Sequence, residues 1–225
     1  MVDHLIFDLD GTLVDSATIC TDILNAMLRD RGVERTIRVD EAVPYMSRGG
    51  THLVSGLLAE HCHDPASDLA EFRQRYAISP TPHGCMFPGV RDGLRRLKSS
   101  GYSLAICSNK PQNLCEKVLD DVGLRDHFPV VVGSRPGLRP KPHPDLLDAT
   151  LDALGTDARR CLFVGDSDLD RDIAGARGVP FLFVTYGYGD EAMEQERLTR
   201  FSAFTDLVEF VTITYGRSQR FRNVA

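Results

Sequence analysis

The sequence predicts an α/β fold: a doubly wound parallel sheet with an all-helical insert after its first strand. Two observations carry this prediction. Short apolar runs of strand length alternate with amphipathic segments of helix length, which is typical of a parallel sheet covered on both faces. Between Leu13 and Met86, however, no strand-like apolar run occurs, and the hydrophobic spacing is helical.

The first strand is expected at Leu5 to Phe7, a short apolar run of the kind that is buried on both faces. It leads directly into Asp8 and Asp10, and Gly11 then permits a tight turn. Open α/β sheets bind ligands at the carboxyl ends of their strands, so these two carboxylates are expected at a ligand site. A strand that ends in an acidic surface turn would account for Asp8 alone equally well.

The insert is expected to open with a helix capped by Asp15-Ser16 and to close with a connector rich in proline and glycine over Ser79–Gly84. We therefore expect residues 16–85 to form the insert, and residues 1–15 and 86–225 to form the core. The later core elements alternate, with strands expected at 102–107, 130–132, 161–164 and 181–184 and helices at 90–100, 113–122, 145–154, 169–177 and 202–212.

Three predicted strands end in polar residues, and the carboxyl ends of parallel strands share one edge of the sheet. These residues are Asp8 and Asp10, Ser108 and Asn109, and Asp166 and Ser167. A further segment places Lys141 between prolines, which hold the chain extended and prevent a helix there. The side chains of all four segments are therefore expected to meet in one crevice.

The residue types suit phosphoryl transfer. Asp8, Asp10 and Asp166 are hard oxygen ligands of the kind that Mg²⁺ takes. A carboxylate can accept a phosphoryl group as an aspartyl-phosphate that water hydrolyses, and a second carboxylate two residues on can act as acid and then as base. Groups able to bind phosphate oxygens or neutralise their charge are Thr12, Ser108, Asn109 and Lys141.

Four stretches resemble, in order, the signature motifs of the haloacid dehalogenase-like hydrolases. They are Asp-Leu-Asp-Gly-Thr-Leu at 8–13, Ser-Asn-Lys-Pro at 108–111, Lys-Pro at 141–142 and Gly-Asp-Ser-Asp-Leu-Asp at 165–170. The resemblance implies a Rossmann-like core and a helical cap, which fits residues 16–85. It also implies Asp8 as the nucleophile, Asp10 as general acid and base, and Ser108 and Lys141 on the phosphate.

The same resemblance implies a Mg²⁺ cofactor held by Asp8, Asp166 and the backbone carbonyl of Asp10. Asp170 would act on this site from behind the direct ligands. The kinked Arg48-Gly49-Gly50 stretch of the insert is either a plain turn or a loop that reads the substrate, and Arg48 is our candidate for a contact with the substrate's far end.

The second and third motifs look most like the phosphoglycolate phosphatase branch. The expected function is Mg²⁺-dependent hydrolysis of a small phosphorylated metabolite through an aspartyl-phosphate. A phosphonatase would need a lysine in the insert, and residues 1–97 contain none. A sugar phosphomutase is disfavoured because Thr18–Thr21 lacks the usual histidine, whereas pyrophosphatase and nucleotidase relatives stay open. So does a phospho-accepting receiver or binding module, although a receiver has no helical insert.

Composition narrows the partners further. A net charge of -6 and a pI near 5.6 argue against nucleic acid or an anionic membrane as partner. No apolar run reaches membrane-spanning length, and the first residues lack a secretion-signal pattern. The six cysteines are scattered without a CxxC pair, so we expect buried thiols in a reducing cytoplasm and no zinc site. The exact substrate and the oligomeric state are left open.

Overall fold

The computed structural model describes residues 2–189, 193 and 197–216. Its centre is a six-stranded, wholly parallel sheet with the strand order β3-β2-β1-β4-β5-β6. The strands are β1 (His4–Phe7), β2 (Ser103–Pro111), β3 (Val130–Ser134), β4 (Cys161–Gly165), β5 (Phe181–Val184) and β6 (Thr199–Phe201). The predicted doubly wound, Rossmann-like fold with a helical insert is confirmed.

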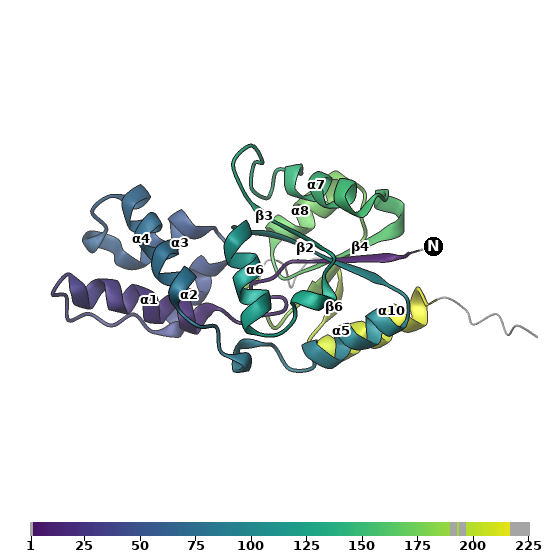
Figure 1. The fold of residues 1–225 in the computed structure, drawn as a ribbon, viewed down its shortest axis with the longest axis horizontal. Coiled ribbons are helices and arrows are strands. Elements are labelled where there is room, and N and C mark those ends of the chain that lie inside the picture. Colours follow the sequence, from purple (N-terminus) through teal and green to yellow (C-terminus); the bar gives the residue numbers. More distant parts are fainter. Residues whose placement is uncertain (1, 190–192, 194–196, 217–225) are drawn as a thin grey trace, which may run out of the picture.

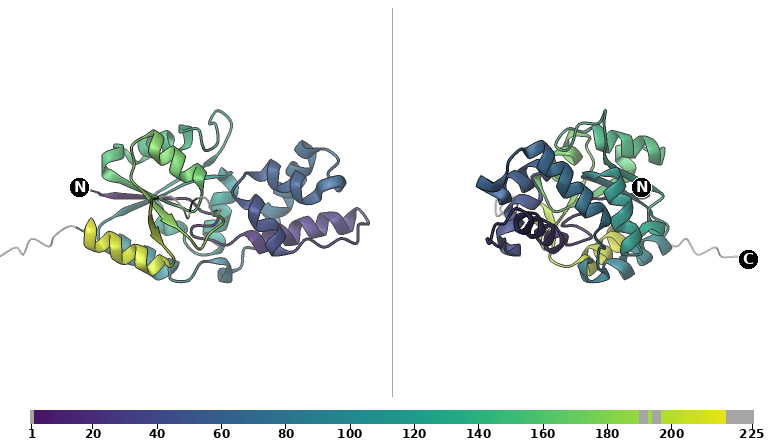
Figure 2. Two further views of the ribbon diagram at one scale, coloured as in Figure 1. Left: turned by 180° about the vertical axis from the view of Figure 1, so that it is seen from behind. Right: turned by 60° about the vertical axis from the view of Figure 1, so that its left-hand side comes forward.

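Helices cover both faces of the sheet (Figures 1 and 2). On one face lie α5 (Val90–Ser99), α6 (Gln112–Asp121) and α10 (Phe204–Thr214); on the other lie α7 (Asp145–Leu154) and α8 (Asp168–Ala176). Because side chains alternate along a strand, β1 serves both layers. Leu5 and Phe7 belong to the first hydrophobic cluster and Ile6 to the second, and all three are fully buried.

The strand order reverses between β1 and β4, which are neighbours in the sheet although they are far apart in sequence. From β1 the chain moves outward through β2 to β3, and it then returns to β4 and moves the opposite way. The loops after β1 and β4 therefore diverge, and a crevice opens beyond their carboxyl ends. Ligands of open α/β sheets bind at such a reversal.

The insert consists of α1 (Ala17–Asp30), α2 (Val39–Met46), α3 (Gly50–Leu58) and α4 (Pro65–Ile78), and it lies beyond the carboxyl edge of the sheet (Figure 1). Its entering and leaving connectors pair with each other. The Asp15 amide donates to the Cys85 carbonyl at 2.7 Å, and the Phe87 amide donates to the Leu13 carbonyl at 3.1 Å. The division at residues 15/16 and 85/86 stays a prediction, and residues 217–225 of the expected core lie outside the described residues.

Three local details differ from the sequence prediction. Strand β2 does not end at Cys107 as expected but continues to Pro111, with a register shift against β3 between these two residues. Of the expected cap Asp15-Ser16, Asp15 Oδ1 accepts from the Ala17 amide at 3.1 Å, whereas the Ser16 hydroxyl donates to Asp10 and does not cap the helix. The edge strand β6 was not predicted, because it spans only three residues and two of them, Thr199 and Arg200, are exposed. A strand this short has no apolar run to reveal it. Within the described part of the chain, no helix has the length and apolarity needed to cross a membrane.

Substitution of two of the helical glycines, Gly93 in α5 and Gly175 in α8, should change stability in opposite directions. A Cβ at Gly93 would lie 2.6 Å from the Phe204 ring and 2.9 Å from Val208 on α10, whereas a Cβ at Gly175 would meet nothing within 4 Å. Alanine gains about 1 kcal/mol of helix propensity at either site, but overpacking costs about 1–3 kcal/mol. Gly93→Ala should therefore lower the Tm by a few degrees and Gly175→Ala should raise it, as thermal unfolding will show. Equal shifts would refute the close packing of α5 against α10.

Candidate active site

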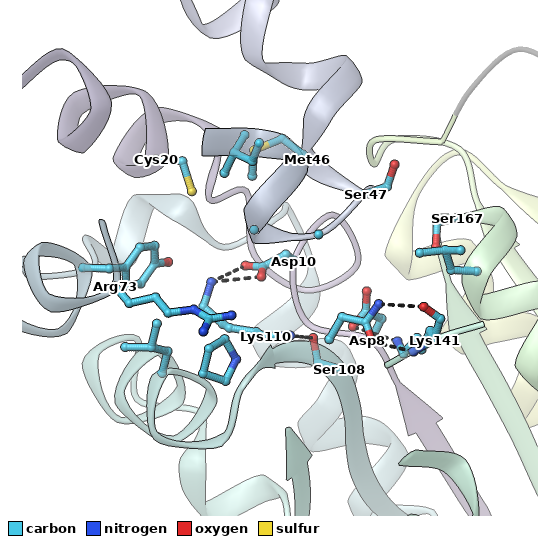
Figure 3. Close-up of a pocket in the computed structure, with 18 of the residues that line it drawn as sticks. Asp8, Asp10, Cys20, Met46, Ser47, Arg73, Ser108, Lys110, Lys141 and Ser167 are labelled. Carbon is cyan, nitrogen blue, oxygen red and sulfur yellow. Dashed lines mark hydrogen bonds and ion pairs between the residues drawn. The ribbon is translucent and has the colours of Figure 1, made fainter. Parts of the chain in front are cut away.

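A cavity of about 100 Å³ lies between the carboxyl edge of the sheet and the insert (Figure 3). From the core it is lined by residues of the predicted segments, namely Asp8, Asp10, Ser108, Asn109, Lys141 and Asp166. From the insert it is lined largely by apolar groups together with the polar residues Ser47, Arg73 and Tyr76. The strand ends thus meet in one place, and the insert closes over them.

The loop after β1 packs tightly against the end of β4. Gly11 has a φ of +78°, and a Cβ there would lie 2.1 Å from an oxygen of Asp166. Only glycine accepts both this backbone conformation and this approach. The Thr12 hydroxyl donates to Asp166 Oδ1 at 3.0 Å, and the Tyr188 amide donates to Asp166 Oδ2 at 2.7 Å. The buried Asp166 carboxylate is therefore fixed from two loops.

Three carboxylates, those of Asp8, Asp166 and Asp170, each place an oxygen within 4.8 Å of the other two. Asp166 and Asp170 are almost completely buried. Burial disfavours the charged form, so it raises the pKa of Asp8 to about 6, with Asp170 and Asp10 adding to the rise and Lys141 and Ser108 opposing it. Burial, together with Asp170 and Asp8, also raises the pKa of Asp166 well above its usual value.

Lys141 is the cation of this cluster. Its buried Nζ lies 2.6 Å from Asp170 Oδ1 and 3.1 Å from Asp8 Oδ1. The contact with Asp8 lacks hydrogen-bond geometry, so Asp8 Oδ1 is a buried oxygen without a hydrogen-bond donor among the described residues. The Asn109 side chain holds the Lys141 backbone: its Oδ1 accepts from the Lys141 amide at 2.7 Å, and its Nδ2 donates to the Lys141 carbonyl at 3.3 Å. The Lys141-Pro142 peptide is cis.

A second ion pair lies on the insert side of the crevice. Lys110 Nζ donates to both oxygens of Asp10, at 3.0 and 2.9 Å (Figure 3). The Ser16 hydroxyl also donates to Asp10. The Lys110 ammonium lies 4.2 Å from the centre of the Tyr76 ring, a cation–π contact with the insert. The Lys110 side chain is only 7% exposed, so this ion pair is shielded from water.

These residues fit a divalent cation. Four carboxylates, of Asp8, Asp10, Asp166 and Asp170, face two ammonium groups, an excess of two negative charges when all six groups are ionised. Buried like charges are costly unless a counter-charge is near. The carboxylates of Asp8, Asp166 and Asp170 lie close enough together to share one ion, and carboxylate oxygen suits a hard cation.

The comparison with known families agrees with this geometry. The family model described as haloacid dehalogenase-like hydrolase matches residues 5–184. The chain belongs to the haloacid dehalogenase-like hydrolases. This hydrolase is 34% identical to a phosphoglycolate phosphatase of Rhodobacter capsulatus (93% of this chain, 98% of the relative). It is 36% identical to one of Rhodospirillum rubrum (85% and 83%).

Solved structures agree on the fold. A predicted phosphoglycolate phosphatase from Haemophilus somnus superimposes with a TM-score of 0.79 at 24% identity, covering 93% of this hydrolase and 98% of that chain. The expected membership of the phosphoglycolate phosphatase-like branch and the expectation of a phosphoric monoester hydrolase are confirmed by the sequence relatives.

Several predicted site residues have partners of their own in the hydrolase. Thr12 is fully buried and its hydroxyl donates to Asp166, and the Asn109 side chain forms hydrogen bonds with the Lys141 backbone. Both side chains therefore already have partners other than a phosphate. The two oxygens of Asp170 accept from Lys141 and from Ser167, which agrees with a place behind the direct metal ligands. Their functional roles stay predictions.

Arg48 lies apart from the cavity lining. Its guanidinium pairs with Asp168 Oδ2 at 3.0 Å, across the gap between insert and core. The neighbouring Ser47, Gly49 and Gly50 do line the cavity. The expected contact of Arg48 with substrate stays a prediction, but here Arg48 bridges the two parts of the chain.

The sequence analysis included Lys110 in the second motif but assigned it no role, and it missed Tyr188 and the cavity-lining residues of α4. Lys110 belongs to the second motif. The chain has only four lysines, so a lysine beside a strand end was a signal that the sequence contained. Tyr188 gave no signal: its backbone amide holds Asp166, while its hydroxyl donates to Asp15 at 2.7 Å and accepts from the Ser16 amide at 2.8 Å. One residue thus joins the acidic cluster to the start of the insert.

Thr12 offers a test of how Asp166 is positioned. Thr12→Val removes the hydroxyl donor without changing the shape, and the loss of such a supporting contact weakens metal binding about 10–100-fold. The matched control is Thr21→Val, which removes another buried hydroxyl whose partner is the Ala17 carbonyl of its own helix. Calorimetric Mg²⁺ titration should show weaker binding in Thr12→Val alone. Equal affinity in both variants would contradict the supporting role of Thr12.

Proposed function

We propose that this hydrolase removes the phosphate of 2-phosphoglycolate, or of a phosphorylated hydroxy acid of similar size, through an aspartyl-phosphate on Asp8. The carrying observation is the Asp8 Oδ1 atom, which is buried without a hydrogen-bond donor among the described residues and belongs to a cavity-lining residue. This oxygen is shielded from water and lies 3.1 Å from the Lys141 ammonium, and in that position it can act as a nucleophile. The Ser108 side chain and the Lys141 ammonium next to it supply donors for phosphate oxygens.

The size of the cavity supports a small substrate. Ligand pockets of drug-sized molecules are about 300–1,000 Å³. The cavity here, about 100 Å³, is well below that range. A two-carbon phosphate ester fits such a space, whereas a nucleotide would require the insert to move away. The two curated relatives named above are phosphoglycolate phosphatases, which supports the same substrate.

In the proposed reaction, the Asp8 carboxylate attacks phosphorus, so that an Asp8 O–P bond forms and the ester P–O bond breaks. Asp10 gives its proton to the leaving glycolate oxygen. A water then attacks the phosphorus of the aspartyl-phosphate, Asp10 takes the proton of that water, and the O–P bond to Asp8 breaks to release inorganic phosphate. Lys110 and Ser16 hold Asp10 at the cavity while it is ionised, after it has given its proton to glycolate and before it takes one from water.

The cofactor that we propose is Mg²⁺, held by Asp8, Asp166 and the backbone carbonyl of Asp10, with Asp170 behind these ligands. When bound, it would offset the charge between the phosphate and the surrounding carboxylates. Lys141 contacts both Asp8 and Asp170, so it keeps these two carboxylates in place whether or not a cation is bound.

The substrate and the nucleophile are tested together. With Mg²⁺ present, kcat/KM for 2-phosphoglycolate should exceed the values for a nucleoside monophosphate, a sugar phosphate and pyrophosphate by about tenfold or more, the scale of one charge-assisted contact. Phosphate release under steady-state conditions measures this. Acid quenching during turnover should trap radioactive phosphate on the wild-type protein.

The control for this experiment is Asp8→Asn, an isosteric change that removes the nucleophile. It should reduce kcat by about 100-fold or more and abolish the trapped phosphate. Circular dichroism should show an intact fold, because burial already disfavours the charged form of Asp8. Trapped phosphate that persists in Asp8→Asn would refute the assignment of the nucleophile, and a stronger preference for a nucleotide would refute the substrate.

The raised carboxyl pKa values predict how pH affects metal binding. Because burial raises the pKa of Asp8 to about 6, this carboxyl holds a proton below pH 6 and must release it to bind a cation. In the folded, metal-free protein this preference for the proton adds stability as the pH falls through 6. The rise in Tm produced by saturating Mg²⁺ over EDTA should therefore be large at pH 7.5 and small at pH 5.5. An increment that does not change with pH would contradict this.

A further inference from the structure

The cavity has one cationic side chain that the proposed chemistry does not use. Lys110 pairs with Asp10, and Lys141 pairs with Asp8 and Asp170. Arg73 of α4 also lines the cavity, and across the described chain it has no hydrogen-bond or ion-pair partner. Figure 3 shows its side chain reaching from the insert over the cavity. The core side of the cavity is acidic, so Arg73 gives the insert side the opposite charge.

Arg73 lies next to the start of another helix. A Cβ built on Gly50, the first residue of α3, would be 4.0 Å from a terminal nitrogen of the Arg73 guanidinium. Gly49 and Gly50 both line the cavity, and no side chain caps α3. The uncapped amides of its first turn carry a partial positive charge. A guanidinium and a helix N-terminus therefore lie side by side at the same wall.

Tyr76 supplies the independent observation that a ligand belongs here. It lies three residues after Arg73 on α4, so the two side chains share one face of the helix. Tyr76 is completely buried and lines the cavity, yet its hydroxyl forms no hydrogen bond of good geometry within the described structure, although the Lys110 ammonium lies close to it. A buried hydroxyl without a partner is costly, which points to a ligand that accepts from it.

We propose that Arg73, Tyr76 and the first turn of α3 form a subsite for a carboxylate on the substrate, opposite the phosphate-binding core. A carboxylate accepts two parallel hydrogen bonds from a guanidinium, and its remaining lone pairs accept from the hydroxyl and the helix amides. The subsite makes Arg73, and not Arg48, the residue that recognises the far end of the substrate. This inference rests on the proposed function, because it assigns the carboxylate end of a small phosphorylated acid.

The test uses inhibitors, so that it does not depend on which ester is the physiological substrate. Phosphonoacetate and ethylphosphonate share a phosphonate and a two-carbon chain, but only the first has a carboxylate. Each is titrated against Mg²⁺-dependent hydrolysis of p-nitrophenyl phosphate by the full chain. In the wild type, phosphonoacetate should inhibit about tenfold more strongly, or better. In Arg73→Gln this preference should fall to about twofold or less.

Two matched variants separate the subsite from a general charge effect. Arg48→Gln removes the competing arginine of the insert, and Arg95→Gln removes an exposed arginine of α5 that pairs with Asp92. Both should keep the preference for phosphonoacetate. If Arg48→Gln loses the preference while Arg73→Gln keeps it, the proposal is overturned. It is likewise overturned if the wild type shows no preference.

Tyr76→Phe examines the hydroxyl separately. It should reduce the preference for phosphonoacetate several-fold, and the Tm without ligand should be unchanged or higher, because an unpaired buried hydroxyl is removed. A lower Tm with an unchanged preference would show that the hydroxyl serves the fold and would remove Tyr76 from the subsite. A wild type that prefers phosphonoacetate but does not hydrolyse 2-phosphoglycolate would reject the proposed substrate and retain the carboxylate subsite.

Discussion

The crowding of four carboxylates, two of them buried and two partly buried, at one edge of a parallel sheet is the constraint on which this structure depends. Like charges repel one another strongly where water is excluded, so each carboxylate requires a counter-charge or a hydrogen-bond donor. Lys141 forms ion pairs with Asp8 and Asp170, and Lys110 forms one with Asp10. The supporting contacts of the neighbouring loops serve to hold these few groups at their distances. The reversal of strand order creates the crevice in which these carboxylates lie, and their charges require the lysines and hydrogen-bond donors that surround them.

The core and its acidic centre were predictable from the sequence because they depend on local order. A buried strand followed by polar residues places these residues at the carboxyl edge, and parallel pairing of β1 with β4 then brings Asp8 near Asp166. The partners of these carboxylates were harder to predict. Tyr188 reaches Asp166 and Asp15 through the conformation of a loop, and no hydrophobic period encodes that contact. The edge strand β6 was not predicted for a related reason. It is held by backbone pairing with β5, and its three residues contain no apolar run that a sequence pattern could detect.

In the insert, the hydrophobic periodicity of the sequence was not enough to predict which residues line the cavity. Helical spacing indicates which residues share a face of α4, but it does not say whether that face meets the sheet, another helix or a cavity. Arg48 was predicted to contact the substrate because it precedes two glycines in a kinked stretch. In the structure its guanidinium forms an ion pair with Asp168. Arg73 and Tyr76 stand in an ordinary amphipathic helix, and only the packing of α4 over the strand ends distinguishes them. Chemistry on strand ends is therefore easier to read from sequence than chemistry on packed helices.

The pairing of the two connectors has a consequence for how such proteins diversify. Because the chain leaves the core and re-enters it at adjacent points joined by backbone hydrogen bonds, the intervening segment is a closed loop on an otherwise continuous framework. The entropy of closing a loop grows only slowly with its length, so segments of other lengths could begin and end at the same two points. Recombination there would replace the wall that meets the organic part of a substrate and leave the phosphoryl chemistry untouched. New specificities would then arise by exchange of a module instead of by gradual change within the catalytic loops.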